Sequence, residues 1–327
     1  MSQHDHEPSG HASTGGYAVL ADRTLVRISG PGTDKFVQGQ FSQQVDDITM
    51  TRSLRAAACT PKGRTYCLTR MVRDGDDLLM DLDHELAERT LTHLRKYLML
   101  FRGTTMETVE SAEILGLVGQ PCARELAGER VDALSNPGDV AELDDGYLIL
   151  LEPTVDGTAR YEYWSPRGPA RRPSENPELS LRQWQGACIR AGVPWLTPQG
   201  HEAYVPQMLN LQHLQGIHFK KGCYTGQEVV ARMHFLGQLK KSLYRLTASG
   251  LTDAPAPGTR VLADGKNAGE VVNAVMTDDQ VAEILAVLRH NSANQPLTLD
   301  DDRGTTAELA TLPYVVPEQQ NASESDT

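Results

Sequence analysis

The spacing of hydrophobic and polar residues in the first third of the chain predicts an α+β domain with an antiparallel sheet. Four short runs have the composition and alternation of strands, and they cover residues 23–29, 54–60, 65–73 and 78–83. Thr33 stands where it can cap a short helix that ends at residue 40, and the turn PKGR (61–64) joins two of the strands. Leucines at roughly helical spacing predict a helix over residues 84–98.

The rest of the chain divides into a second α+β stretch and an all-β end. The second stretch has strand-like runs at 113–119, 147–152 and 160–166. The proline-rich, polar segment 167–180 is typical of a linker, and a helix is predicted over 181–191 because Gly192 and Pro194 follow it. Five short runs separated by turns then predict a small β-barrel, at 241–248, 259–264, 268–275, 281–289 and 296–300.

These patterns predict three folded units and two tails. The expected units are an α+β unit made from 16–110 and 180–238, an intervening α+β unit with its linker over 111–179, and a barrel over 239–317. Residues 1–15 and 318–327 are polar and predict disordered tails. We expect His4, His6 and His11 to belong to the first tail and not to a metal site.

Composition limits the classes of protein to which the chain can belong. Hydrophobic residues make up 39% of the 327 residues and charged residues 23%, which is typical of a globular protein. No apolar run approaches the ~20 residues that span a bilayer, and the N-terminus lacks a signal-peptide pattern, so we expect a cytoplasmic protein without membrane association. The net charge of −12 disfavours extended contact with nucleic acid, although a small anion can bind where the local charge is positive.

The five cysteines predict reduced thiols, one of which is unlike the others. They are odd in number, widely spaced and without a CxxC pair, which argues against a zinc ribbon or a thioredoxin-type motif. Cys223 lies in the segment FKKGCYTGQEVVARMHFLG (219–237), between two lysines and a predicted helix. The remaining four lie in apolar or strand-like surroundings and are expected in the core: Cys59, Cys67, Cys122 and Cys188.

The residues around Cys223 favour a reactive thiolate. Thr225 and Glu228 have the spacing of a capping box, so we expect a helix to begin there. The partial positive charge at the start of that helix, together with Lys220 and Lys221, favours thiolate over thiol. Flanking glycines place the sulfur on a loop and not in a core. The apolar face of the helix is expected to carry Val229, Met233 and Leu236.

Two kinds of chemistry fit this motif when its residues are considered alone. A cysteine-dependent hydrolase needs a base, for which His201, His218 and His234 are candidates. A protein that handles metal or sulfur would use the Cys223 thiolate as a ligand or carrier. The motif by itself leaves both alternatives open.

Longer stretches of the sequence resemble the YgfZ family, the folate-binding proteins that assist iron–sulfur enzymes and belong to the superfamily of the glycine-cleavage T-protein. The segment KKGCYTGQEVVAR (220–232) is similar to the family signature. From Gly192 onwards the chain also follows the family order of Gly-x-Pro, then Pro-Gln-x-x-Asn-Leu-Gln, then Gly-Ile-x-Phe-Lys-Lys-Gly-Cys. Further similar segments are KFVQGQFSQQV (35–45), PKGR (61–64) and TLPYVVP (311–317).

The resemblance implies a T-protein-like fold, with a folate-binding α+β unit, an intervening unit and a C-terminal β-barrel. The first unit would bind tetrahydrofolate or a derivative. The reactive site implied by the resemblance is Cys223, with Lys221, Gly222, Tyr224 and Gly226 around it. The residues that it implies at the folate are Trp184, Arg23, Lys62 and Arg64.

Three positions depart from the family pattern. Arg23 stands where some members carry a tryptophan, and an arginine can stack on a flat ring or pair with the folate glutamate. In the loop FSQQV, Ser42 and Gln44 replace the Thr-x-Asp of the superfamily, so the usual carboxylate is missing. Asp46 and Asp47 follow closely, but we do not expect them to replace it.

The function that the resemblance implies is that of an accessory protein for assembly or repair of iron–sulfur clusters. Folate and iron–sulfur client enzymes, including the radical enzymes that thiolate tRNA, would be its partners, without direct contact to nucleic acid. Cys223 would act as a thiolate that holds iron or sulfur or resolves an oxidised species. Any iron–sulfur cluster would be transient, with Cys223 as an iron ligand, or shared with a partner, because a single thiolate does not hold a cluster alone. The alternative is an aminomethyl or one-carbon transferase, which needs the carboxylate that Gln44 replaces.

Overall fold

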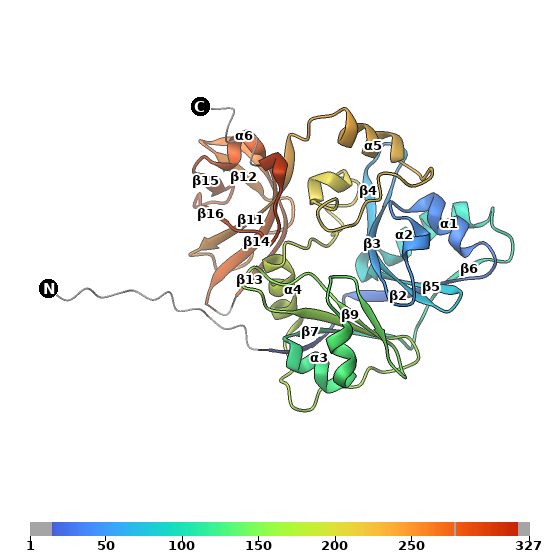
Figure 1. Cartoon of the computed structure of the whole chain (residues 1–327). Coiled ribbons are helices and arrows are strands. Elements are labelled where there is room, and N and C mark those ends of the chain that lie inside the picture. Colours follow the sequence, from blue (N-terminus) through green and yellow to red (C-terminus); the bar gives the residue numbers. More distant parts are fainter. Residues whose placement is uncertain (1–14, 278, 320–327) are drawn as a thin grey trace.

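The computed structural model describes residues 15–277 and 279–319, which fold into two antiparallel sheets of five strands and a closed barrel (Figure 1). The sheets have the strand orders β3-β4-β5-β2-β6 and β1-β7-β10-β9-β8, and we call them the first and the second sheet. The α+β class and the C-terminal barrel predicted from the sequence are therefore confirmed. Among the described residues, every helix is too short or too polar to span a bilayer.

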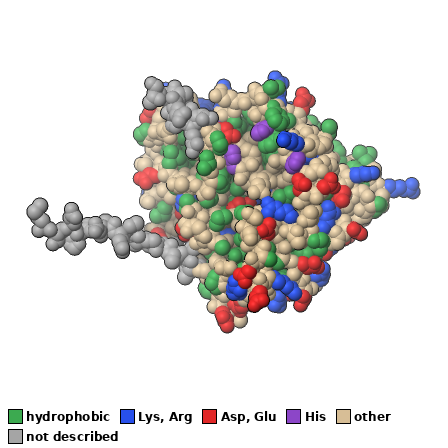
Figure 2. All heavy atoms as spheres, in the orientation of Figure 1, with side chains coloured by type: hydrophobic (Ala, Val, Ile, Leu, Met, Phe, Trp, Pro, Cys, Tyr) green, Lys and Arg blue, Asp and Glu red, His purple; other side chains and the backbone are tan. Residues whose placement is uncertain are grey.

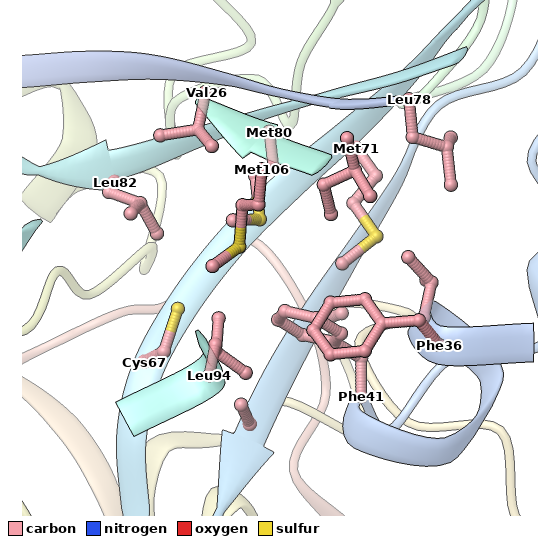
Figure 3. Packing of buried hydrophobic residues seen from close by; sticks show 14 of the residues in the cluster. Val26, Phe36, Phe41, Cys67, Met71, Leu78, Met80, Leu82, Leu94 and Met106 are labelled. Carbon is pink, nitrogen blue, oxygen red and sulfur yellow. The ribbon is translucent and has the colours of Figure 1, made fainter. Parts of the chain in front are cut away.

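The first sheet contains the predicted hairpins, and two helices cover one of its faces. Its strands are β2 (Arg23–Ser29), β3 (Leu54–Cys59), β4 (Thr65–Asp74), β5 (Asp77–Asp83) and β6 (Thr105–Thr108). The covering helices are α1 (Thr33–Gln40) and α2 (His84–Leu98). Phe36 of α1 and Leu94 of α2 pack with Met71 and Met80 of the sheet in one buried cluster (Figure 3). The hydrophobic spacing of the sequence thus places both helices on the same side of the sheet.

The second sheet packs against the other face of the first sheet. Its strands are β1 (Gly16–Val19), β7 (Glu113–Val118), β8 (Val140–Glu142), β9 (Tyr147–Leu150) and β10 (Arg160–Ser165), and α3 (Gln120–Ala127) covers its outer face. Leu79 of the first sheet shares a buried cluster with Ile149 and Trp164 of the second. Strand β1 was not predicted, and it carries residues 16–19 into the second sheet and not into the first unit.

The segment 167–180 is tied to the second sheet and is not the free linker that its composition suggests. Arg172 forms an ion pair with Glu113 at 2.7 Å, and the backbone N–H of Leu179 donates to the carbonyl of Tyr17. Helix α4 (Leu181–Arg190) follows and lies between the second sheet and the barrel. The segment 167–180 and helix α4 are therefore both packed against the rest of the fold.

The barrel closes in the order β11-β14-β13-β12-β15-β16, and β16 was missed by the sequence prediction. Its elements are β11 (Lys241–Ser249), β12 (Arg260–Ala263), β13 (Lys266–Met276), β14 (Val281–Arg289), α6 (His290–Ala293), β15 (Leu297–Leu299) and β16 (Thr306–Ala310). Asn210, which follows η3 (Pro206–Leu209), exchanges two hydrogen bonds with the backbone of Leu243 in β11. These bonds join the barrel to the segment that leads to Cys223.

The chain end is ordered further than predicted. Glu318 accepts hydrogen bonds from Gln212 and His213, and Gln319 donates to the carbonyl of Leu243. Residues 318 and 319, which were predicted to belong to a disordered tail, are therefore tied to the fold. Residues 1–14, with His4, His6 and His11, and residues 320–327 lie outside the described residues.

Helices α1 and α4 begin in different ways. Thr33 is the first residue of α1 and not its cap, because Gly32 holds the cap position and the Thr33 hydroxyl donates to the carbonyl of Gly30. Helix α4 begins with a capping box that the sequence analysis did not identify, in which Ser180 and Gln183 each accept from the other's backbone N–H.

Candidate functional site

A narrow cavity lies where the first sheet, β10 and the segment after α4 meet. The space within it, including the part open to solvent, comes to about 580 Å³. Side chains alternate along a strand, so Arg23, Arg70 and Asp81 face the same side as the buried residues two positions away from them. Six charged residues line the cavity: Arg23, Arg55, Arg70, Asp81, Arg160 and Glu162.

A half-buried carboxylate holds two of these arginines. Glu152 accepts from Arg55 at 2.7 and 3.1 Å, which is a bidentate contact, and from Arg70 at 3.5 Å. Burial alone would raise the pKa of Glu152, but the charges of Arg55 and Arg70 hold that pKa well below its usual range. Burial, followed by the repulsion of Arg55, lowers the pKa of Arg70 to about 10. The cavity wall is therefore an ion-pair network with more positive than negative groups.

Two buried donors on the cavity wall have no partner in the described structure. Arg70 is 3% exposed and Arg160 is 1% exposed, yet the Nε of each lacks a hydrogen-bond acceptor. The other guanidinium nitrogens of Arg160 donate to the carbonyl of Glu152 at 3.2 Å and to Cys188 Sγ at 2.9 Å. Leaving a buried N–H unpaired costs about 1–3 kcal/mol, so a ligand that supplies an oxygen acceptor would be stabilised here.

Trp184, the predicted folate-stacking residue, is a core residue in this structure. It is 3% exposed, and both faces of its indole are covered. A Cβ built on Gly116 would lie 2.4 Å from one side of the ring, and Arg160 Cζ lies 4.6 Å from the ring centroid. Trp195 lines the cavity instead, and its indole is half-buried. Its place directly after the Gly-x-Pro segment was the signal that could have identified it.

Of the predicted folate residues, Arg23 lines the cavity, whereas Lys62 and Arg64 do not. Arg23 Nη1 lies 3.3 Å from Asp81 Oδ2 at the cavity wall. Lys62 and Arg64 are exposed on the PKGR turn, where Arg64 donates to the carbonyl of Ala203. The structure thus separates the four residues that the sequence analysis grouped together.

Cys223 is exposed, and the other four cysteines are buried, as the sequence analysis predicts. It is not among the described residues that line the cavity. Neighbouring Gly222 is also exposed, and a Cβ built on it would lie 3.7 Å from Gln38 Nε2, so no close contact requires a glycine there. Tyr224, by contrast, is buried, and burial raises the pKa of its hydroxyl.

Lys221 is buried, and its ammonium group holds the Cys223 loop in place. It is not a free cation at the surface. Its Nζ donates to the carbonyl oxygens of Gln38, Phe41 and Gln43, at 2.8, 2.6 and 2.6 Å. The ammonium also lies 4.9 Å from the ring centroid of Tyr224. Burial lowers the pKa of Lys221 to about 7. The Lys221 ammonium is therefore bound to backbone at the end of α1, whereas Lys220 is the exposed lysine of the pair.

The helix after Cys223, α5 (Gln227–Phe235), lacks the predicted capping box. Gly226 occupies the cap position with φ of 85°, and no side chain caps the helix. A Cβ on Gly226 would lie 2.5 Å from the carbonyl oxygen of Thr60, so the close approach to the hairpin also requires glycine. The Thr225 hydroxyl lies 3.5 Å from Gln40 Oε1, away from the helix start. Cys223 therefore stands three residues before the cap, on the loop that leads into it.

The loop FSQQV is buried beneath the cysteine motif. The Ser42 hydroxyl donates to the carbonyl of Gly216 at 2.6 Å, and Gln43 Nε2 donates to the carbonyl of Gln215 at 2.5 Å. Gln44, where the superfamily often has a carboxylate, donates to Asp46 at 3.0 Å. The loop thus serves to hold the motif segment in place.

The three candidate bases lie in separate surroundings. His218 Nε2 is 3.8 Å from Asp47, His201 Nδ1 is 3.8 Å from Glu202, and His234 stacks on Phe219. In the part of the chain that the structure describes, none of them is hydrogen-bonded to Cys223, and no group of three or more potential metal ligands lies together.

No family model matches the chain, but known proteins are similar to it over nearly its whole length. The proteins named tRNA-modifying protein YgfZ from Escherichia coli (strain SMS-3-5 / SECEC) and Shigella boydii serotype 4 (strain Sb227) are each 31% identical to it over 312 residues. These alignments cover 92% of this chain and 93% of each relative. Among solved structures, glycine cleavage system aminomethyltransferase T from Bartonella henselae superposes with a TM-score of 0.67. That match covers 94% of this chain and 87% of the other at 14% identity, so it shows a shared fold.

Proposed function

Because the chain belongs to the YgfZ family of tRNA-modifying proteins, we propose that it is a folate-binding accessory protein for the assembly or repair of iron–sulfur clusters. Through its client enzymes, among them radical enzymes that thiolate tRNA, it would affect tRNA modification. The observation that carries the proposal is that Cys223 is exposed while the other four cysteines, all within the described residues, are buried. A thiol that serves a partner protein has to be reachable, and this one is.

The cavity between the sheets is the proposed folate site, and two observations support the fit. The space in it that a water molecule can enter is only about 30 Å³, against the about 300–1,000 Å³ usual for ligand sites, so side chains have to move before a ligand of folate's size enters. The free Nε groups of Arg70 and Arg160 would donate to carbonyl or carboxylate oxygens, of which folate has several. Trp195 offers an indole face to a flat ring. Because the cavity is narrow, we expect Arg23 to move away from Asp81 when folate enters.

Cys223 is the proposed reactive group at the surface. Because four ligands usually hold an iron–sulfur cluster, one thiolate would bind iron or sulfur only together with ligands of the partner. The protein would then contribute the thiol, and folate in the cavity would tune or protect the site. The transferase alternative lacks a carboxylate at Gln44, whose amide is hydrogen-bonded to Gln38 and Asp46.

The role of Cys223 can be tested by rescue in bacterial cells that lack the endogenous homologue. We expect the wild type to restore a thiolated tRNA nucleoside and Cys223→Ser to fail. The matched control is Cys122→Ala, which alters a buried cysteine of α3 and should rescue. Immunoblots would verify equal expression. Equal rescue by Cys223→Ser would contradict the proposal and make this thiol structural.

The folate site can be tested with two tryptophans that differ in exposure. We expect Trp195→Leu to weaken binding of tetrahydrofolate about tenfold, because it removes a stacking face. Trp184→Phe should leave the affinity nearly unchanged and lower the melting temperature, since that ring is packed on both faces. Isothermal titration calorimetry under anaerobic conditions measures both. A loss of affinity for Trp184→Phe alone would place the folate elsewhere.

A further inference from the structure

Helix α5, which follows the Cys223 loop, leaves its hydrophobic end at the surface. Val230 is the buried residue of this helix, whereas Phe235 is 61% exposed and Leu236, just beyond the helix, is 83% exposed. The predicted apolar face of Val229, Met233 and Leu236 is thus wrong: Val229 and Met233 are half-buried, and Leu236 is exposed. Large exposed hydrophobic side chains beside a functional residue are typical of interaction sites.

The aromatic side chains at this end are packed on each other before any partner binds. The rings of Phe219 and His234 stack with centroids 3.6 Å apart and an interplanar angle of 11°. Phe235 stands edge-on to both, at 4.7 Å from His234 and 6.2 Å from Phe219. Because these contacts already fix the rings, a partner would lose little side-chain entropy by binding them.

Positive charge surrounds this aromatic cluster, although the chain as a whole carries −12. Residues 218–242 contain five basic residues and one acidic residue, Glu228. Lys220, Arg232 and Lys240 are exposed. The PKGR turn adds Lys62 and Arg64, and it lies beside α5 because a Cβ on Gly63 would meet Val229 at 2.7 Å. On the face drawn in Figure 2, hydrophobic and basic side chains lie together at the upper edge, where Figure 1 shows α5.

We propose that the α5 end, defined as Phe219, His234, Phe235 and Leu236 with the surrounding basic residues, docks an acidic surface that contains an apolar pocket on a client protein. The identity of the client as an iron–sulfur enzyme rests on the proposed function. The client surface is expected to be acidic, because acidic groups complement the basic residues around the α5 end. The client is expected to have an apolar pocket, because Phe235 and Leu236 would be buried in it as anchors. Docking here would bring the client to the segment that carries Cys223, because Phe219, four residues before Cys223, stacks on His234 at this end of α5.

A protein partner fits this surface better than a nucleic acid does. The stacked rings and cations could bind single-stranded RNA, but Leu236 is aliphatic and offers no face for a base. The net charge of the rest of the chain also opposes a polyphosphate backbone. An acidic protein surface with a pocket uses both the cations and the aliphatic side chain.

The test measures the affinity of the purified full-length chain for a purified radical tRNA-thiolating iron–sulfur enzyme by biolayer interferometry at two salt concentrations. We expect the double variant Phe235→Glu/Leu236→Glu to weaken binding at least about tenfold. The matched control is Met99→Glu/Leu100→Glu, at sites that are 79% and 78% exposed beyond the end of α2, and it should bind as the wild type does. Higher salt should weaken wild-type binding.

Each further outcome decides the proposal. Equal affinity of the Phe235→Glu/Leu236→Glu variant and the wild type, or no binding of the client by the wild type, overturns it. Binding of purified tRNA that is lost in this variant also overturns it, in favour of a nucleic-acid surface. Docking of the client by the wild type together with equal rescue by Cys223→Ser would keep this proposal while contradicting the role of the thiol, so the two failures are distinguishable. Circular dichroism verifies that the variants are folded.

Discussion

The cavity between the sheets and the Cys223 loop are both built around buried cations, but they hold them in opposite ways. The cavity takes arginines from separate strands, so the hydrogen-bonded sheets fix their positions, and carboxylates pair with them. The Cys223 loop depends on one lysine, whose ammonium is held by three backbone carbonyls. The cavity is therefore shaped by strand register, whereas the loop is held at a single point.

This difference fits the proposed division of roles. A site that binds a small ligand gains from positions that are fixed before binding, because less entropy is lost. A thiol that must meet a second protein has to lie at the surface, where strands give it little support. Lys221 supplies the missing support from beneath the loop, so that Cys223 remains exposed without the loop being free.

The largest expected loss of stability comes from breaking the network at the cavity. Glu152→Gln removes the charge that pairs with Arg55 and Arg70, and Arg70 is 3% exposed. An unpaired buried charge costs about 3–5 kcal/mol, which urea unfolding would measure. Since the pKa of Glu152 is held below its ordinary value, its contribution is present above that value and is lost as the pH falls through the folded pKa. The difference from the wild type should therefore shrink in strong acid.

A matched change for Glu152→Gln is available on α5. Glu228 is exposed there, and Glu228→Gln should change the free energy of unfolding by less than about 0.5 kcal/mol. A loss of less than about 1 kcal/mol for Glu152→Gln would mean that the arginines are hydrated or re-paired, and that the cavity is not held by this carboxylate.

The next largest effect should come from the adjacent lysines of the motif. Lys221→Met keeps the length of the side chain but leaves three carbonyls without their donor, which should cost about 2–3 kcal/mol. Lys220→Met alters an exposed residue and should change stability by less than about 0.5 kcal/mol. Hydrogen exchange should also become faster at residues 219–226 in Lys221→Met. Equal effects of the two substitutions would show that Lys221 does not anchor the loop.

Elements whose burial shows in the local spacing of side chains could be predicted from the sequence, whereas others could not. Strand runs such as 23–29 and the helix 84–98 were predicted correctly because period-two and helical spacing report which side chains are buried. The exposure of Cys223 was also correct, since lysines and glycines surround it. Strands β1, β6, β8 and β16 were missed because each has only three to five residues, too few to show a clear alternation.

The cavity could not be predicted from the sequence, because the residues that line it come from separate strands. Arg55, Arg70 and Arg160 each lie within a strand run, at positions where alternation turns them toward the space between the sheets. A charged residue at a buried position is a signal, but the partners that make it a site come from another strand. Lys221 shows the same limit, because neighbouring Lys220 is exposed and nothing local separates the two.

The smallest predicted effect compares two helix starts that look alike in sequence. Ser180 and Thr225 each stand three residues before a glutamine or glutamate, but Ser180 accepts from the backbone of Gln183, whereas Thr225 caps no helix. Ser180→Ala should therefore cost about 1 kcal/mol, the usual value for a lost cap. Thr225→Ala should stay within about 0.5 kcal/mol, because its hydroxyl makes one long contact of 3.5 Å with Gln40. Urea unfolding of both variants measures the difference, and equal losses would restore the capping box at α5 and move the helix start one residue nearer to Cys223, from Gly226 to Thr225.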